Sequence, residues 1–563
     1  SAYCRKLHQN NCMQRDWWKW GDPKEIKHIN DYPKLKTLVE ERWKTHLRED
    51  FFPPKKFELP QLSEKKKEQI KDIFASIYPK KISFSDDDRL FVSLGKSYYD
   101  VIRIFNGQGF ISPDVVIVPT THEEIQYILT QASANNVQII PFGGGTNVVG
   151  ALSLDNLAGR TEIKCTLDLR KYKRMLHIDE EHLTATFEAG IFGPELEKIL
   201  NAKGFTLGHF PQSFEYSTLG GWLVTRGAGQ ESTYYGKIED LVEHIKVATP
   251  AGTLESNQFT HDASGINVLP FFTGSEGTLG VVTELTIKIK KLPKNYRWIV
   301  GLFPTFQEGT NYLKELAQAG VKPSVVRLSD ANETNLFSKM SSSEEHPGLL
   351  NDLKKEAQKL ILQWKNLSAP CVLIMRFPQG EISVSSQVIY AKELVEKHKG
   401  MLAPTTIGDK WADNRFKLPY LRDTLVEHSI YIDTMETLVN WKDISKLHQA
   451  LTRELNKSVA FNKNKGIFLA HISHIYPNAA CMYFTLITPM LKGREIEQWQ
   501  ELKDLVTNTI MQHNGAVSHH HSVGLDHQKW YKKYTDTLAL DILKAVKSKL
   551  DPKGIMNPGK LFS

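Results

Sequence analysis

The stretch Pro141-Phe142-Gly143-Gly144-Gly145-Thr146-Asn147 decides how the rest of the chain is interpreted. It directly follows Val137–Ile140, an apolar run that predicts a buried strand. Consecutive glycines let a backbone adopt unusual dihedral angles, and successive N–H groups in such a turn form a nest for an anion. No Gly-Lys-Ser/Thr follows, which excludes a P-loop, and no GxGxxG opens a helix, which disfavours nicotinamide binding in a Rossmann crevice. A flexible turn is the alternative interpretation.

Three further glycine-rich segments favour a ligand over a bare turn. They are Phe210–Gly229, Gly236–Val242 and Thr273–Val282. Small residues let a ligand lie close against the main chain. Together with the first loop, these stretches predict a long, close-fitting ligand that is held mostly by backbone groups.

The order and the amino-acid sequences of these segments resemble those of the FAD domain of the vanillyl-alcohol oxidase flavoprotein superfamily, and the resemblance extends to the terminal Asp551–Lys560. It implies FAD as the cofactor, with its diphosphate on Gly143–Asn147. The cofactor-binding residues that it implies are Pro141, Phe142, Gly143, Gly144, Gly145, Thr146, Asn147, Gln212, Ser213, Phe214, Glu215, Tyr216, Ser217, Thr218, Thr225, Arg226, Gly227, Ala228, Glu276, Gly277, Thr278, Leu279, Gly280, Val281 and Val282.

Length and composition limit the class of protein. A chain of 563 residues is too long for one compact core, so two or three domains are expected. Apolar residues make up 41% and charged residues 24%, which excludes a largely disordered chain. The formal charge of +7 is a mild excess of positive charge that suits anionic ligands or a membrane surface, and it is too small to indicate nucleic-acid binding.

The cysteines, Cys4, Cys12, Cys165, Cys371 and Cys481, form no CxxC pair. This pattern predicts a reduced intracellular compartment, and neither a disulfide framework nor a cysteine-based zinc site is expected. No apolar stretch is long enough to span a bilayer, and no secretory signal is recognisable.

Changes in composition divide the chain into four parts, and the fold class expected is α+β. Residues 1–82 are charged and tryptophan-rich and are expected to form a helical N-terminal extension. Residues 83–295 are expected to form a two-part FAD-binding domain. Residues 296–540 are expected to form an α+β cap that binds substrate, and residues 541–563 a segment that returns to the FAD domain.

Periodicity predicts individual elements within these parts. The expected helices are Lys34–Leu47, Ser63–Ser76, His122–Asn136, Thr305–Gly320, Gln387–Gly400 and Trp441–Asn456. Short apolar or alternating runs predict strands at Val115–Val118, Val281–Ile289 and Cys371–Phe377.

The second informative motif is Gly515–Gly524, which contains the histidine triplet His519, His520 and His521. Imidazoles titrate near neutral pH, so the triplet places proton carriers on one loop or strand end. Adjacent side chains point in different directions, so a single metal ion is not expected to bind all three. From the residues alone, a surface turn and a metal site that includes His513 are the alternatives.

This motif is similar to the Ser-His-His-His loop of the alkyldihydroxyacetonephosphate synthase family. The same resemblance includes Trp17–Gly21, Gly208–Pro211, Ser324–Asp330, Tyr420–Asp423 and Ala480–Phe484. It implies exchange of the acyl chain of acyl-dihydroxyacetone phosphate for a long-chain fatty alcohol, which gives alkyl-dihydroxyacetone phosphate and a fatty acid with no net redox change. The flavin is implied to act as a covalent holder of the dihydroxyacetone-phosphate carbon.

This reaction needs cations for a carboxylate and a phosphate, and groups that move protons. By the resemblance, Arg422 is expected to bind a substrate anion, and Arg327 to help organise the flavin or the substrate. Tyr483 matches the family's catalytic tyrosine, and its ordinary pKa of about 10 requires a neighbouring cation or histidine to activate it. The histidine triplet completes the catalytic set as base or hydrogen-bond partners. From the residues alone, each arginine equally fits a surface ion pair, and Tyr483 fits a core aromatic.

Three positions depart from the family pattern. Gln212 stands where Asp is usual, Gly227-Ala228 where Ala-Ser is usual, and Ser522 where Gly is usual. The first two bear on individual flavin contacts.

Two other functions are weighed. An FAD-dependent D-2-hydroxyacid dehydrogenase, such as one acting on D-lactate, resembles this chain in the FAD block but usually has Glu-His-Gly where this chain has His520-His521-Ser522. A non-catalytic lipid-binding protein with a flavin fold is the other.

The resemblance also implies partners and a location. Peripheral contact with membrane lipid and a homodimer are expected, the acyltransferase that makes the acyl substrate is a further candidate partner, and no nucleic acid is expected. The location implied is the lumenal membrane face of a peroxisome or glycosome, although no peroxisomal signal is visible at Lys560–Ser563.

Overall fold

The computed structural model describes residues 16–43, 57–340, 369–380, 382–463 and 465–562. Cys4, Cys12 and the last residues of the predicted helix Lys34–Leu47 lie outside this part of the chain. None of the described helices is long and apolar enough to cross a membrane.

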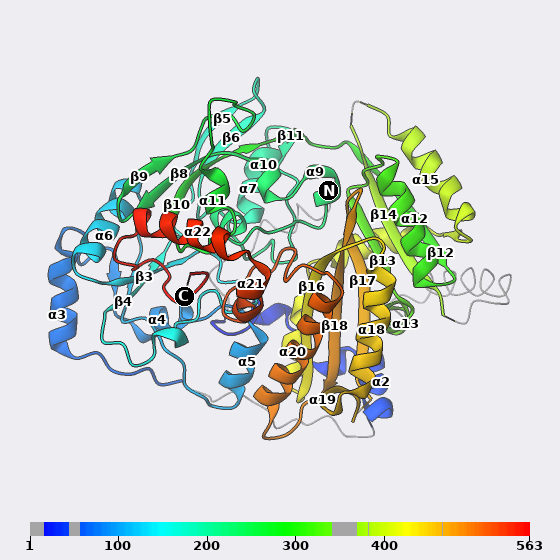
Figure 1. The fold of residues 1–563 in the computed structure, drawn as a ribbon, viewed down its shortest axis with the longest axis horizontal. Coiled ribbons are helices and arrows are strands. Elements are labelled where there is room, and N and C mark those ends of the chain that lie inside the picture. Colours follow the sequence, from blue (N-terminus) through cyan, green and yellow to red (C-terminus); the bar gives the residue numbers. More distant parts are fainter. Residues whose placement is uncertain (1–15, 44–56, 341–368, 381, 464, 563) are drawn as a thin grey trace.

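Two sheets and their helices form the first part of the molecule (Figure 1). The smaller sheet has the order β1-β2-β4-β3, with parallel pairing except at β1. The larger sheet has the order β5-β6-β10-β8-β9 and is antiparallel. The strands are β1 (Ile82–Ser83), β2 (Val115–Ile117), β3 (Gln138–Phe142), β4 (Lys164–Asp168), β5 (Met175–Asp179), β6 (Thr184–Glu188), β8 (Val242–Thr249), β9 (Gly252–Glu255) and β10 (Val281–Lys288), and β7 (Phe205–Thr206) pairs separately with β11 (Lys290–Lys291).

The second part is built on a seven-stranded antiparallel sheet of order β15-β12-β14-β13-β17-β18-β16. Its strands are β12 (Asn295–Phe303), β13 (Val325–Ser329), β14 (Cys371–Gln379), β15 (Met401–Ala403), β16 (Ile430–Asn440), β17 (Ile467–Ile475) and β18 (Ala479–Pro489). The even-numbered residues of β18, such as Phe484 and Leu486, are fully buried in the core that the covering helices share. The odd-numbered Tyr483, Thr485 and Ile487 line a cavity instead, as the two-residue period of a strand requires.

The helices follow the predicted periodicity closely. In the first part they are α3 (Glu64–Ile73), α4 (Asp86–Phe91), α5 (Tyr98–Phe105), α6 (His122–Ala134), α7 (Gly193–Asn201), α8 (Leu219–Val224), α9 (Ser232–Tyr235), α10 (Ile238–Leu241) and α11 (Leu269–Phe272). In the second they are α12 (Phe306–Gln318), α13 (Ala331–Met340), α15 (Ser385–Lys397), α16 (Thr406–Asn414), α17 (Leu418–Val426), α18 (Ile444–Lys457), α19 (Val459–Asn462), α20 (Glu495–Gln512) and α21 (Gln528–Tyr534). The last helix, α22 (Thr537–Leu550), returns to the first part, where Val546 and Leu550 pack against the core of the larger sheet.

The N-terminal region packs on both parts. Leu35 and Val39 of α2 (Pro33–Trp43) join the core of the second part, whereas Ile70 and Ile73 of α3 join the core of the parallel sheet. Ser63 caps α3 by accepting a hydrogen bond from the Lys66 N–H. The region is therefore helical in both stretches described, but each stretch packs on a different core.

The C-terminal residues run beside β3, directly before the glycine loop. Ile139 donates its N–H to the Ile555 carbonyl at 2.9 Å, and Asn557 donates its N–H to the Ile139 carbonyl at 2.8 Å. The buried Asp551 holds this turn because its carboxylate accepts the N–H groups of Ile555 and Met556 and pairs with Lys547 at 2.5 Å. The C-terminus thus supports the strand that carries the loop.

Replacing Asp551 by Ala removes an acceptor from two buried N–H groups and the carboxylate partner of the Lys547 ammonium, which keeps only its hydrogen bonds to the Thr278 and Met556 carbonyls. We expect the free energy of unfolding of the FAD-loaded protein, measured with urea, to fall by about 2–4 kcal/mol. The matched control is Asp541→Ala on the same helix, whose exposed pair with Lys544 is 3.7 Å long and contributes about 0–1 kcal/mol. Equal effects of the two substitutions would contradict this account.

Candidate active site

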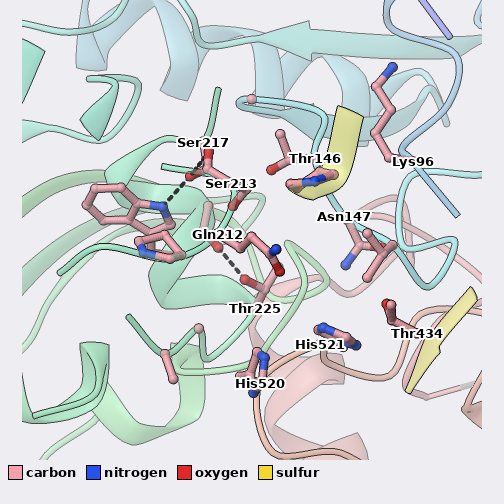
Figure 2. A pocket seen from close by; sticks show the side chains of 18 of the residues that line it. Lys96, Thr146, Asn147, Gln212, Ser213, Ser217, Thr225, Thr434, His520 and His521 are labelled. Atoms are coloured by element: carbon pink, nitrogen blue, oxygen red, sulfur yellow. Dashed lines mark hydrogen bonds between the residues drawn. The ribbon is translucent and has the colours of Figure 1, made fainter. Parts of the chain in front are cut away.

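A cavity of about 370 Å³ lies between the loops of the first part and the seven-stranded sheet, a volume typical of cofactor and ligand sites. Figure 2 shows Thr146 and Asn147 of the glycine loop around the same space as His520 and His521. Most of the predicted cofactor-binding residues line it: Pro141, Gly143, Gly144, Gly145, Thr146, Asn147, Gln212, Ser213, Ser217, Thr218, Thr225, Gly227, Ala228, Glu276, Gly277, Gly280, Val281 and Val282.

The glycine loop lies too close to its neighbours for side chains. A Cβ atom at Gly144 would stand 1.9 Å from the Tyr216 carbonyl oxygen, and one at Gly143 would stand 2.4 Å from Thr218 Oγ1. Gly145 has φ +65°, in the left-handed region. Within the described part of the chain, no protein acceptor is found for the N–H groups of Gly144, Gly145 and Thr146. A glycine-only cradle with available donors therefore fits a dinucleotide diphosphate.

Residues from the segment 212–228 line the cavity across from the glycine loop, and hydrogen bonds between near neighbours in the sequence hold them in place (Figure 2). Trp222 Nε1 donates to Ser217 Oγ at 2.7 Å, and Thr225 Oγ1 donates to the Gly221 carbonyl at 2.8 Å. Thr218 caps α8 by accepting the Gly221 N–H. These bonds hold the predicted 212–228 wall rigidly, as a close-fitting FAD requires.

The remaining predicted cofactor residues lie behind this lining. Phe142, Phe214 and Leu279 are buried in the cores. Arg226 is exposed and pairs with Glu239 at 3.0 Å, and Thr278 Oγ1 donates to the Ser275 carbonyl. The Tyr216 hydroxyl accepts the Asp22 N–H at 3.0 Å, and its neighbour Glu215 is half-buried. These side chains shape the cofactor loops from behind and are not part of the cavity lining.

Strand register brings the catalytic candidates together. Tyr483 of β18 pairs with Glu436 of β16 on one side and with His471 of β17 on the other. The His471 and Tyr483 rings are stacked at 5.0 Å, and the His520 ring is nearly parallel to Tyr483 at 6.1 Å. Burial raises the pKa of Tyr483 above its ordinary value. The phenol therefore keeps its proton at neutral pH, although the charge of the nearby Arg327 acts to lower its pKa, in the direction that activation by a cation requires.

Arg327 lines the cavity within a buried triad. Its guanidinium pairs with Glu333 at 2.9 Å and approaches His471 Nε2 at 3.2 Å, while His471 Nδ1 lies 2.9 Å from the same Glu333 oxygen. Burial acts to raise the pKa of Glu333, but Arg327 and His471 lower it to about 2. Arg327 is therefore held in place by a fully charged carboxylate.

Glu436 organises the histidine loop, which we define as Ser518–Gly524. Its buried carboxylate accepts the N–H groups of His519, His520 and His521 at 2.6, 3.1 and 2.9 Å, and the Ser518 hydroxyl at 2.6 Å. Burial acts to raise the pKa of Glu436, but the three histidines and Ser518 lower it well below its ordinary value. One carboxylate thus positions all members of the triplet through their backbone.

A second buried carboxylate holds the other end of the loop. Glu276 accepts the N–H groups of Val523 and Gly524 at 2.7 and 2.9 Å. Ser522 stands where the family usually has glycine. Its φ of +72° lies in the left-handed region, which glycine adopts more easily than other residues, so the usual glycine is expected there. Its hydroxyl accepts a hydrogen bond from Asn147 Nδ2 at 3.2 Å. The serine therefore gains a contact to the glycine loop that glycine lacks.

The triplet splits between two environments. His520 and His521 line the cavity, whereas the buried His519 lies behind it, with Nε2 2.8 Å from the Tyr476 hydroxyl and its carbonyl accepting from Lys237 Nζ at 2.9 Å. Burial lowers the pKa of all three histidines. The imidazoles are therefore neutral at physiological pH.

Arg422 lines the cavity but already has protein partners. Its Nε and Nη2 donate to Asp423 Oδ1 at 3.1 and 2.9 Å, and its Nη1 donates to the Lys96 carbonyl at 2.8 Å. A guanidinium carries five N–H donors, so these bonds leave capacity for a substrate oxygen. Arg415, which sequence reasoning missed, also lines the cavity and pairs with the buried Glu231 at 2.8 Å.

Sequence reasoning missed Glu436, Glu333, His471 and His474 as members of this site. Each is a single polar residue inside a strand or helix with no local motif around it. Their grouping arises from strand register, and an internal polar residue at a cavity-facing position of β16 or β17 was the only available signal.

Replacing Glu436 by Gln keeps the shape of the side chain but turns one acceptor into a donor that faces backbone N–H groups. We expect a loss of about 2–4 kcal/mol in the free energy of unfolding, because buried donors lose their acceptor. Urea unfolding of the FAD-loaded protein measures it. The exposed Glu497→Gln on α20 is the control, and an unchanged stability of the Glu436 variant would contradict the proposed role of the carboxylate.

The buried His527 gives a pH prediction. Its Nδ1 donates to the Ser522 carbonyl at 2.9 Å, and burial lowers its pKa to about 3. The unfolded chain binds a proton here below about pH 6.5 while the folded chain does not, so this contribution to stability is lost as pH falls, by about 1.4 kcal/mol per unit. On going from pH 7 to pH 5, we expect His527→Gln to lose about 2 kcal/mol less unfolding free energy than the unsubstituted protein. The exposed His261→Gln should follow the unsubstituted protein.

Comparisons with known proteins agree with this geometry. Residues 113–256 match the family described as FAD binding domain, and residues 292–561 match FAD linked oxidases, C-terminal domain. The chain is 33% identical to an alkyldihydroxyacetonephosphate synthase of Dictyostelium discoideum, over 88% of this chain and 80% of that protein. It is also 33% identical to one of Trypanosoma brucei brucei, over 84% of this chain and 77% of that protein.

Solved structures and more distant relatives complete the comparison. A structure of alkyldihydroxyacetonephosphate synthase superposes with a TM-score of 0.82 at 29% identity, and covers 98% of this chain and 100% of that one. A mitochondrial D-lactate dehydrogenase of Arabidopsis thaliana is 26% identical, over 80% of this chain and 73% of that protein. The identity over most of both chains, with the glycine cradle and the histidine loop on one cavity, shows that the chain belongs to the alkyldihydroxyacetonephosphate synthase family of FAD flavoproteins.

Proposed function

We propose that this protein makes ether-lipid precursors by exchanging the acyl chain of acyl-dihydroxyacetone phosphate for a long-chain fatty alcohol. The products are alkyl-dihydroxyacetone phosphate and a fatty acid. The observation that carries the proposal is the histidine loop and Tyr483 on the same cavity as the FAD cradle, in a chain whose relatives of 33% identity carry the synthase name. The D-lactate type dehydrogenase is the more distant alternative.

Gly143–Asn147 and the 212–228 wall would hold FAD, which would supply an electron-accepting ring beside the reacting carbon of the substrate. The protein has to place that carbon, hold two anions and move two protons. One proton leaves the reacting carbon, and the other leaves the incoming alcohol.

We assign the proton transfers to His520 and His521, which line the cavity as neutral imidazoles. A neutral imidazole accepts a proton, and the imidazolium that forms is stabilised by Glu436, whose oxygens lie 3.7 and 3.9 Å from Nδ1 of His520 and His521. The same carboxylate stays charged throughout because its pKa is far below neutrality. The imidazoles then return one proton to the reacting carbon, and the proton of the alcohol leaves with the carboxylate group of the fatty acid or passes to solvent.

Tyr483 and the arginines act on the oxygens. A protonated phenol donates a hydrogen bond, so Tyr483 is suited to an oxygen that becomes more negative as the acyl group leaves. Arg327 and Arg422 present guanidinium groups at the cavity wall for the phosphate and the carboxylate. Each is already paired with a carboxylate, Glu333 or Asp423, which fixes its direction.

We also propose peripheral contact with membrane lipid, a homodimer, the acyltransferase as a partner, and a lumenal location in a peroxisome or glycosome. These proposals rest on the family. The long-chain substrates require access from a lipid surface, and the net charge of +7 is compatible with an anionic one.

The test is to incubate FAD-loaded protein with palmitoyl-dihydroxyacetone phosphate and labelled hexadecanol. We expect labelled ether product and free palmitate in equal amounts, with no oxygen uptake. Tyr483→Phe should lower the rate by about 10²–10⁴-fold with FAD content unchanged, while Tyr534→Phe, at an exposed tyrosine, should not.

Absence of ether product from intact FAD-loaded protein would overturn the proposal. Anaerobic bleaching of the flavin by D-lactate would favour the dehydrogenase instead. FAD-loaded protein that acts on neither substrate set would favour a non-catalytic lipid-binding role.

A further inference from the structure

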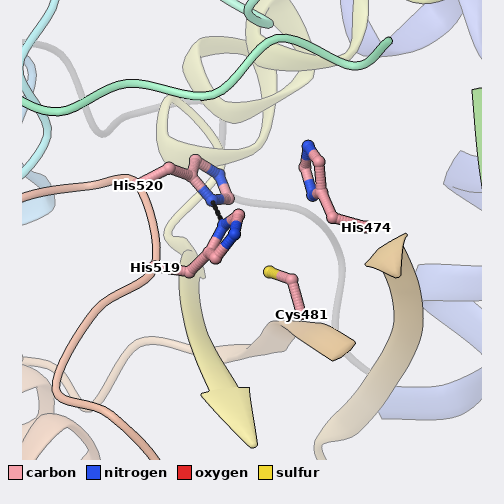
Figure 3. Close-up of side chains that lie close together, drawn as sticks. All are labelled: His474, Cys481, His519 and His520. Atoms are coloured by element: carbon pink, nitrogen blue, oxygen red, sulfur yellow. Dashed lines mark hydrogen bonds between the residues drawn. The ribbon is translucent and has the colours of Figure 1, made fainter. Parts of the chain in front are cut away.

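A second cluster of ligand-type side chains lies next to the cavity, where β17 ends and β18 begins. His474 and Cys481 are register partners on these strands. The register shifts between Ile472 and His474, so His474 faces the same side as His471 although the two histidines are three positions apart. The histidine loop brings His519 and His520 to the same place. Figure 3 shows the three imidazoles and the thiol around one small space.

The donor atoms of these four residues are close enough to share one ion. One ring nitrogen of each histidine and the Cys481 sulfur all lie within 4.8 Å of one another. His519 Nδ1 and His520 Nδ1 are 3.0 Å apart. In a tetrahedral zinc site with bonds of about 2.0–2.3 Å, ligand atoms are separated by about 3.3–3.7 Å. The longest separations between these donor atoms would have to shorten by about one ångström to form such a site, which rotation of the side chains can achieve.

The outer ring nitrogens are oriented as they are in metal sites. His474 Nε2 donates to the Gly229 carbonyl at 2.9 Å, and its Nδ1 lone pair accepts the Ser473 hydroxyl at 2.8 Å, a hydrogen bond that the ion would replace. His519 Nε2 lies 2.8 Å from the Tyr476 hydroxyl, which accepts as readily as it donates. A ligating histidine typically gives its other N–H to a carbonyl or a similar oxygen, which fixes the ring. Two of the three imidazoles thus have that support.

We propose that His474, Cys481, His519 and His520 bind one zinc ion, and that zinc inhibits the exchange reaction by withdrawing His520 from the substrate. The inhibitory part rests on the proposed function, and the binding part does not. When the Zn–S bond forms, the Cys481 thiol releases its proton to solvent. The proton shared between the Nδ1 atoms of His519 and His520 moves to an outer ring nitrogen, so that both face the ion as lone pairs.

Charge and donor chemistry favour zinc over other ions. Three nitrogens and one sulfur suit a borderline metal such as Zn²⁺ and do not suit Mg²⁺ or Ca²⁺, which prefer oxygen ligands. Glu436, 3.7 Å from His520 Nδ1, supplies negative charge, and the Lys237 ammonium acts against it. Cysteine spacing alone predicted no zinc site, because these ligands come from two strands and a loop.

The binding test uses Co²⁺ as a spectroscopic substitute for zinc on FAD-loaded protein in metal-free buffer. We expect one equivalent of Co²⁺ to give tetrahedral bands at wavelengths longer than the flavin absorption, and Zn²⁺ to abolish them. Cys371→Ala should keep the bands, because this buried cysteine lies on β14, which β13 separates from β17. Cys481→Ala should lose them and bind zinc at least about tenfold more weakly.

Bands that are missing in the unsubstituted protein, or that persist in Cys481→Ala, would overturn the zinc site. The flavin spectrum reports whether each variant has folded, and His474→Gln, with the same expected loss, replaces Cys481→Ala if that variant does not fold. In the exchange assay, zinc should inhibit the unsubstituted protein reversibly, with recovery on adding a chelator. Cobalt binding without any exchange by the metal-free protein would refute the proposed function and leave the zinc site standing.

Discussion

The Glu436 carboxylate is the constraint on which the site depends. It is fully enclosed, and it accepts three consecutive backbone N–H groups and a hydroxyl of the histidine loop. Burying a carboxylate is unfavourable unless several donors surround it, so the loop and the charge stabilise each other. The loop cannot shift without leaving the charge unsatisfied. The direction in which His520 and His521 face the cavity follows from this single group.

The histidine loop also sets the two parts of the molecule in relation to each other. Glu436 belongs to the seven-stranded sheet, whereas Glu276 belongs to the first part, and both carboxylates bind the same seven-residue loop. Asn147 of the glycine loop adds a bond to Ser522. The glycine loop and the imidazoles of His520 and His521 are therefore connected through one loop, which is bonded to both parts of the molecule.

Local sequence signals predicted individual helices and the turn at the glycine loop, because those features are local. The capped helices and Gly143–Gly145 have signatures within a few residues of each other, and the predicted helix His122–Asn136 differs from α6 only at its C-terminal end. Glu436, Tyr483 and His471 form one row only because β16, β18 and β17 are neighbours in that register. Single polar residues in three separate strands carry no such signature. The site was thus predictable where a motif is contiguous and not where register creates it.

The cavity has a charge balance that suits an exchange reaction. The cavity-lining Arg327, Arg415 and Arg422 are each paired with a carboxylate, from Glu333, Glu231 and Asp423 respectively. If these arginines bind the substrate phosphate or the product carboxylate, as proposed, the anion shares a cation that is already paired, which moderates the affinity for both anions. An enzyme that turns one anionic lipid into another has to release a fatty acid in every cycle. Arginines that are already paired can orient the group being transferred without binding the departing fatty acid too tightly. The neutral histidines add no further positive charge until they take up a proton.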